Sequence, residues 1–214
     1  MKNNVTEIVF ILDKSGSMHS LVNDTIGGFN SMLNKQKEEA GEAFVTTVLF
    51  SDSSTTIHDR LPISKVPEMT TKDYWASGCT ALIDSLGETI DHISKIHKYA
   101  RPEDVPANTI FIITTDGMEN ASHKYSAKDV KKTIEKKQKE DGWEFIFLGA
   151  NIDAVQTADN LGIRPEMAVQ YHADVVGTAV NYECMSEAVS CVRTKGKLGS
   201  SWRKKADADY AKRG

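Results

Sequence analysis

Short apolar runs alternate along the chain with longer segments in which apolar residues recur every three or four positions. Three of the short runs are apolar at nearly every position: 7–12, 109–115 and 144–149. Strands that are buried on both faces of a parallel sheet have this pattern. Segments 43–52 and 54–63 alternate more regularly and predict a hairpin at a sheet edge, with Pro62 ending the second strand. Segment 166–173 is a weaker strand candidate.

The segments between these strands have helical periodicity. In 21–39, four apolar residues recur at spacings of four, three and four: Val22, Ile26, Phe29 and Leu33. Similar patterns predict further helices at 81–98, 126–142, 153–162 and 174–195. Strands that alternate with helices indicate an α/β fold. We therefore expect a doubly wound, mostly parallel, six-stranded sheet with one antiparallel edge strand and helices on both faces.

Composition fits a single folded unit. The chain has 214 residues, of which 40% are hydrophobic and 26% charged, enough for one well-covered core. The pattern of strands and helices predicts a domain at 1–193. Segment 194–214 has few apolar residues and many basic ones, so it is expected to be a flexible tail in which only Trp202 could act as an anchor.

Charge and cysteine content narrow the functional classes. A net charge of −4 disfavours attraction of the whole molecule to nucleic acid or to an anionic membrane. No apolar run approaches the length of a membrane span or of a signal-peptide core. Three cysteines without CxxC spacing suggest neither a zinc cluster nor a disulfide framework: Cys79, Cys184 and Cys191. We expect a cytoplasmic protein.

Polar residues follow two of the buried strands directly. Asp13, Ser15 and Ser17 come straight after the first strand, and Asp116 comes after 109–115. Thr80 lies in a loop just before the helix expected at 81–98. In doubly wound sheets, ligands bind outside the carboxyl ends of the strands, so we expect these side chains to share one edge.

Two carboxylates and three hydroxyls form a set of oxygen ligands for a hard cation. Mg²⁺ suits this set because it prefers octahedral oxygen coordination; Mn²⁺ would also fit, and Ca²⁺ is less suited. The absence of Cys and His ligands argues against zinc. Hydroxyl ligands carry no formal charge, so the cation would stay ready to accept another anionic ligand.

The three loops resemble a known family. "DKSGS" at 13–17, "SGCTAL" at 77–82 and "TTDG" at 114–117 resemble the metal ion-dependent adhesion site (MIDAS) of von Willebrand factor type A (VWA) domains. The resemblance covers about residues 5–193. It implies that the hydroxyls of Ser15, Ser17 and Thr80 contact the metal directly and that Asp13 and Asp116 act largely through water.

The resemblance also implies a class of partner. In that family, the open coordination position receives an Asp or Glu side chain from a protein. Cytoplasmic bacterial and phage members often serve ATPases or stress and phage systems. The resemblance therefore implies a metal-dependent protein-interaction module whose partner belongs to such a system.

Two other functions are considered. A Mg²⁺-dependent phosphotransferase or hydrolase could use Asp13 as its nucleophile, but such enzymes typically carry a second Asp where this chain has Ser15. A Rossmann-type nucleotide binder is disfavoured because the first loop lacks GxGxxG. Asp52, Glu119 and Asn120 could line the rim of the metal site or only serve ordinary loop structure. Cys79 is expected to be a small, semi-buried thiol and not a catalyst.

Overall fold

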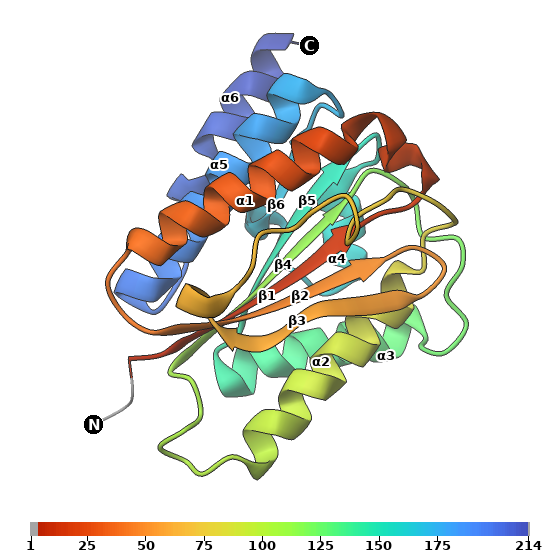
Figure 1. The fold of residues 1–214 in the computed structure, drawn as a ribbon. Helices are drawn as coiled ribbons and strands as arrows, with labels where there is room; N and C mark the ends of the chain where they lie inside the picture. The colour runs from red at the N-terminus through yellow and green to blue at the C-terminus, as the bar shows by residue number, and fades with distance from the viewer. Residues whose placement is uncertain (1–3, 214) are drawn as a thin grey trace.

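The computed structural model describes residues 4–213. Its centre is a six-stranded sheet with strand order β3-β2-β1-β4-β5-β6 (Figure 1). The strands are β1 (Thr6–Asp13), β2 (Ala43–Phe50), β3 (Ser54–Pro62), β4 (Asn108–Thr115), β5 (Glu144–Ala150) and β6 (Ala168–Tyr171). All neighbouring strands are parallel except the β2–β3 pair at the edge. The fold class predicted from the sequence is confirmed.

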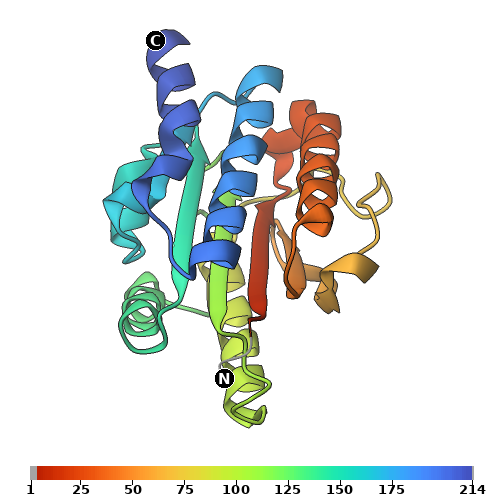
Figure 2. The same cartoon turned by 90° about the vertical axis from the view of Figure 1, so that its left-hand side faces the viewer.

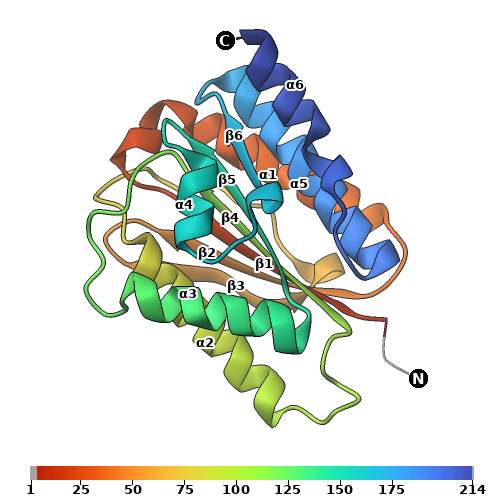
Figure 3. The same cartoon turned by 180° about the vertical axis from the view of Figure 1, so that it is seen from behind.

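Helices cover both faces of the sheet. The helices α1 (Val22–Glu38), α5 (Val175–Lys195) and α6 (Lys204–Arg213) lie side by side on one face (Figure 2). The opposite face carries α2 (Leu82–Tyr99), α3 (Ala127–Lys136) and α4 (Ala154–Asn160) (Figure 3). Because both faces are covered, every residue of β1 is buried. This burial explains the unbroken apolar pattern of the central strands.

Short irregular helices mark where the structure differs from the expected elements. A 3₁₀ helix, Gly16–Leu21, lies between β1 and α1. The helix expected at 126–142 is regular only to Lys136; a π-helical turn, Lys137–Asp141, then runs to Gly142, whose φ of 68° ends it. A glycine at this left-handed position is a common helix end.

The segment expected to be a flexible tail is helical and packed in the structure. A 3₁₀ helix, Ser200–Arg203, leads into α6, which packs along α5 and β6. Leu198, Trp202 and Ala206 are buried, and Trp202 is only 2% exposed. These three residues are four apart, so a sparse apolar stripe faces the domain. The low apolar content of the segment concealed this stripe.

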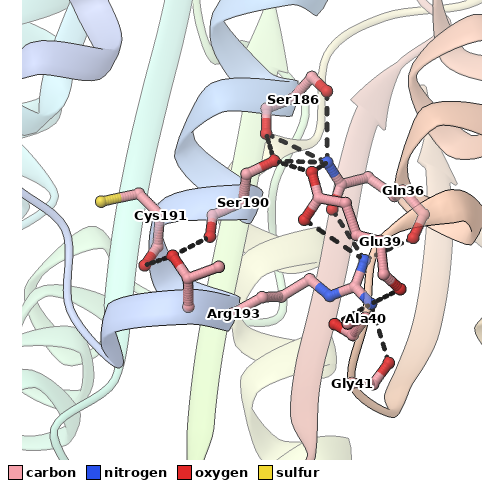
Figure 4. Close-up of polar contacts among 9 residues, drawn as sticks. Gln36, Glu39, Ala40, Gly41, Ser186, Ser190, Cys191 and Arg193 are labelled. Atoms are coloured by element: carbon pink, nitrogen blue, oxygen red, sulfur yellow. Dashed lines mark hydrogen bonds and ion pairs between the residues drawn. The ribbon is translucent and has the colours of Figure 1, made fainter.

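A buried arginine joins the carboxyl ends of α1 and α5 (Figure 4). The guanidinium of Arg193 donates to the backbone carbonyls of the last turn of α1 and the residues after it: Gln36, Glu39, Ala40 and Gly41. Those carbonyls have no partner within the helix, so Arg193 caps α1 from the neighbouring helix. We call Arg193 and these four residues the Arg193 cluster.

No helix within residues 4–213 is long and apolar enough to cross a membrane.

Candidate metal site

Three loops meet at the carboxyl edge of the sheet, where β1 and β4 end beside each other. Leu12 of β1 pairs with Thr114 of β4, so Asp13 and Asp116 stand at the ends of adjacent strands. Adjacent strands lie about 4.8 Å apart. The third loop connects β3 to α2 and carries Thr80 just before that helix. The fold thus brings together the three segments that the sequence predicts.

Hydrogen bonds fix the loops to one another. The backbone N–H of Gly16 donates to the carbonyl of Gly78 at 3.0 Å, and that of Asn120 donates to the carbonyl of Thr80 at 3.1 Å. The Asn120 side chain returns a bond by accepting the Thr80 N–H at 2.9 Å. Gly78 has a φ of +79°, and a Cβ there would lie 2.0 Å from Asp52 Oδ2. Only glycine fits this close approach.

Four of the five predicted residues are linked in one chain of hydrogen bonds. Asp13 Oδ1 accepts the N–H of Ser15 at 2.7 Å. The hydroxyl oxygens of Ser15 and Ser17 are 3.2 Å apart. Ser17 Oγ donates to Asp116 Oδ1 at 2.5 Å. Two aspartates from different strands are therefore bridged by the two serines of the first loop.

The fifth residue, Thr80, lies at the same place. A Cβ built on Gly117 would be 3.4 Å from Thr80 Oγ1 and 3.8 Å from Ser17 Oγ. The hydroxyls of Thr80 and Ser17 therefore both lie close to Gly117, in the loop that carries Asp116. The structure brings all five predicted residues together, and their role as metal ligands stays a prediction.

The site concentrates negative charge in a nearly closed environment. Asp13 is 0% exposed and Asp116 is 4% exposed, whereas Ser17 is exposed and opens the site to solvent. Burial raises the pKa of both carboxyls, and hydrogen bonds from neighbouring groups partly oppose this. Within residues 4–213, no Lys or Arg forms an ion pair with either aspartate. The nearest basic residue in sequence, Lys14, places its Nζ over the Trp75 ring, 4.2 Å from the centroid.

Two residues that sequence reasoning missed hold Asp13. Thr115 Oγ1 donates to Asp13 Oδ2 at 2.6 Å, and Tyr74 OH donates to the Asp13 carbonyl at 2.5 Å. A polar residue at the end of a buried strand, directly before Asp116, was a signal for Thr115. No sequence pattern indicated Tyr74, which is 61 positions from Asp13.

The three rim residues left open by the sequence serve loop structure. Asp52 Oδ1 accepts the N–H of Cys79 at 2.9 Å. Glu119 accepts the N–H of Ile83 in the first turn of α2 at 2.8 Å, a favourable place for a carboxylate. Asn120 binds Thr80 as described. Cys79 is exposed, not semi-buried, and the hydrogen bond and charge of Asp52 raise its thiol pKa, which disfavours a nucleophilic role.

The donor set fits a hard cation. Within residues 4–213, no group of three or more His, Cys, Asp or Glu side chains is placed to hold a metal ion. The oxygen atoms gathered at this edge include the hydroxyls of Ser15, Ser17 and Thr80 beside the two carboxylates. A divalent cation would also offset the two carboxylates, which the described part of the chain leaves without a cationic partner.

No protein-family model and no curated protein matches the chain. Solved structures do resemble it. Proximal thread matrix protein 1 from the mussel byssus, with a zinc-occupied MIDAS motif, superposes with a TM-score of 0.60 at 17% identity, covering 89% of this chain and 47% of that one. A von Willebrand factor type A structure from Catenulispora acidiphila gives 0.56 at 14%, covering 87% and 42%. The pilus adhesin SpaC from Lactobacillus rhamnosus GG gives 0.64 at 12%, covering 87% and 30%.

At these identities the likeness establishes the fold alone. The chain has the VWA fold, which is Rossmann-like, and it spans half or less of the length of these three structures.

Proposed function

We propose that the chain is a metal-dependent protein-interaction module, in which a divalent cation at the three loops captures a carboxylate of a protein partner. One observation carries the proposal: two buried aspartates from adjacent strands are bridged by serine hydroxyls, while no cationic side chain of the described residues pairs with either. Buried charges normally have a partner. Here the partner would come from outside the chain.

The residues divide into two groups. Ser15, Ser17 and Thr80 would hold the cation through hydroxyl oxygens, and Asp13 and Asp116 would hold it largely through water. Mg²⁺ suits the set best, Mn²⁺ would fit, and Ca²⁺ is less suited. The zinc in the mussel protein's MIDAS motif makes Zn²⁺ a necessary comparison. When bound, the cation supplies an open coordination position for a carboxylate.

The partner is proposed to be a protein that presents an Asp or Glu, in an ATPase, stress or phage system of the cytoplasm. This part of the proposal rests on two expectations from the sequence: the resemblance of the three loops to the MIDAS of VWA domains, and a cytoplasmic location. The enzymatic alternative has less support: Asp13 is fully buried, and both its oxygens accept hydrogen bonds, so a nucleophilic attack by it would require the site to open.

Titration calorimetry tests the metal site. Mg²⁺, Mn²⁺, Ca²⁺ and Zn²⁺ are compared on the wild type, Ser17→Ala and Thr80→Val, which remove a hydroxyl without changing charge. Thr55→Val, an exposed strand position, is the matched control. We expect Mg²⁺ to bind the wild type and the control and to bind both site variants at least tenfold more weakly. Equal binding by all four proteins would refute the metal site.

Partner capture tests whether a protein binds through the metal. The immobilised wild type, in Mg²⁺, is expected to retain proteins that EDTA releases and that Thr80→Val does not retain. Retention that is indifferent to both EDTA and Thr80→Val would contradict a metal-bridged partner.

A further inference from the structure

Exposed large hydrophobic side chains are unevenly distributed over the molecule. Among residues 4–213 they are Trp75, Tyr99, Met118, Val155, Val175 and Val176. Four of them, Met118, Val155, Val175 and Val176, lie at the carboxyl edge of the sheet, in the loop or first helical turn that follows a parallel strand. Trp75 is placed near this edge by its contact with Lys14, which follows β1. Scattered single apolar residues need no explanation, but a concentration at one edge marks an interaction site.

Trp75 and Met118 belong to the two loops that carry Thr80 and Asp116. Trp75 is 52% exposed, precedes the Thr80 loop and rests against Lys14, the neighbour of Asp13. Met118 is 74% exposed and follows Asp116 by two residues. The described structure gives neither side chain a core to cover. Trp and Met are enriched at the centres of protein interfaces, where their large apolar area excludes water.

Three exposed valines also lie at this edge of the sheet. Val155 begins α4 after β5, and Val175 and Val176 begin α5 after β6. From β1, the ends of β4, β5 and β6 follow in order. At about 4.8 Å per strand, the edge from β1 to β6 measures roughly 15 Å. An extended segment of about five residues would cover that distance.

We propose that the partner's acidic residue lies within a short apolar segment, which places its carboxylate at the candidate metal site and its apolar side chains on Trp75 and Met118. The inference rests on the proposed function and narrows it. The edge combines a site that requires an anion with apolar flanks, so charge and surface together match an acid between apolar residues. A wholly acidic tail would leave both flanks facing water.

Peptide selection tests the inference. The probe is a library of random linear peptides with a fixed central Glu, and a second library has a fixed Gln. Both are selected on the wild type in Mg²⁺ and in EDTA. The variants are Trp75→Ser, Met118→Ser and Thr80→Val. Tyr99→Ser is the control, because Tyr99 is equally prominent, at 79% exposed, but belongs to the carboxyl end of α2.

Peptides from the Glu library are expected to carry apolar residues beside the Glu and to bind in Mg²⁺ only. Trp75→Ser and Met118→Ser should each weaken them roughly tenfold, as for a central interface residue, and Tyr99→Ser should not. Trp75→Ser, Met118→Ser and Tyr99→Ser should still bind Mg²⁺ like the wild type in calorimetry, unlike Thr80→Val.

Three results overturn the inference, and they are distinguishable. EDTA-sensitive peptides without apolar preference, unaffected by the Trp75 and Met118 variants, leave the proposed function intact. Peptides that ignore EDTA and Thr80→Val refute the proposed function as well. Mg²⁺-dependent dimerisation of the chain that is lost in Met118→Ser would show that a second copy occupies this surface.

Discussion

Two polar clusters of the molecule differ in whether their charged groups have partners within the chain. In the Arg193 cluster, the guanidinium reaches the carbonyls at the end of α1, and Glu39 lies 3.9 Å away. Both terminal nitrogens of the guanidinium are satisfied within the chain, and only its Nε lacks a hydrogen-bond partner. At the three loops, Asp13 and Asp116 have hydroxyl and N–H donors but no cation from the described residues. The Arg193 cluster therefore stabilises the fold by itself, whereas the two aspartates are proposed to take a cation from outside the chain.

The largest effect is expected at the Arg193 cluster. Arg193→Met keeps much of the side-chain volume but leaves the buried carbonyl of Gln36 and three partly buried carbonyls without this donor. Because unsatisfied buried groups are costly, the free energy of unfolding should fall by about 3 kcal/mol. Urea unfolding measures it, and Mg²⁺ binding should be unchanged. Arg101→Met is the control: Arg101 is exposed and paired with Asp104, so its loss should change the free energy of unfolding much less. Equal losses in the two variants would mean that the Arg193 contacts contribute little.

At the metal site, removal of a charge should leave the stability without metal unchanged or raise it. Asp116→Asn removes one of two buried like charges but keeps an oxygen that accepts from Ser17. In EDTA this variant should melt at the same temperature as the wild type or higher, because like charges destabilise each other. Mg²⁺ at a hundredfold excess over Kd should stabilise the wild type by about 2.7 kcal/mol and the variant far less.

Thermal unfolding with and without Mg²⁺ measures both halves of this prediction. Asp59→Asn is the control, since Asp59 is exposed on β3 and pairs with His92. If Asp116→Asn lowers the melting temperature in EDTA while retaining the Mg²⁺ shift, the comparison between the two clusters fails.

The two clusters also differ in how far the sequence reveals them. The site loops were predicted because each has a local pattern: Asp13 and Asp116 follow a buried strand at once, and Thr80 directly precedes a predicted helix. The Arg193 cluster was not, because it joins residues more than 150 positions apart and no local pattern links them. The packing of α6 was not predicted for a related reason: its few apolar residues are buried only because α5 and β6 lie where they can cover them. Tyr74, which holds Asp13, is another contact set by the fold alone.

A third carboxylate, Asp84, can be compared with Asp13 and Asp116. It lies at the start of α2, close to the site, and is also buried. Burial alone would raise its pKa, but the backbone N–H groups of His123, Lys124 and Tyr125 donate to it at 2.8–2.9 Å, and the net shift is downward. Unlike Asp13 and Asp116, this carboxylate has its charge satisfied within the chain. We therefore expect Asp84 to stabilise the fold and not to bind the metal.

Asp84→Ala should lower the free energy of unfolding by roughly 1–2 kcal/mol at neutral pH, since three donors lose their acceptor. A depressed pKa contributes stability above the ordinary pKa, and this contribution disappears as pH falls through the folded-state value. The gap between wild type and variant should therefore narrow below about pH 4. Urea unfolding at neutral and acidic pH measures the gap. The control is Glu88→Ala, a half-buried residue of α2 that pairs with Lys124. Mg²⁺ affinity should be the same in all three proteins; if it falls in Asp84→Ala alone, Asp84 belongs to the metal site and the distinction drawn from its pKa is wrong.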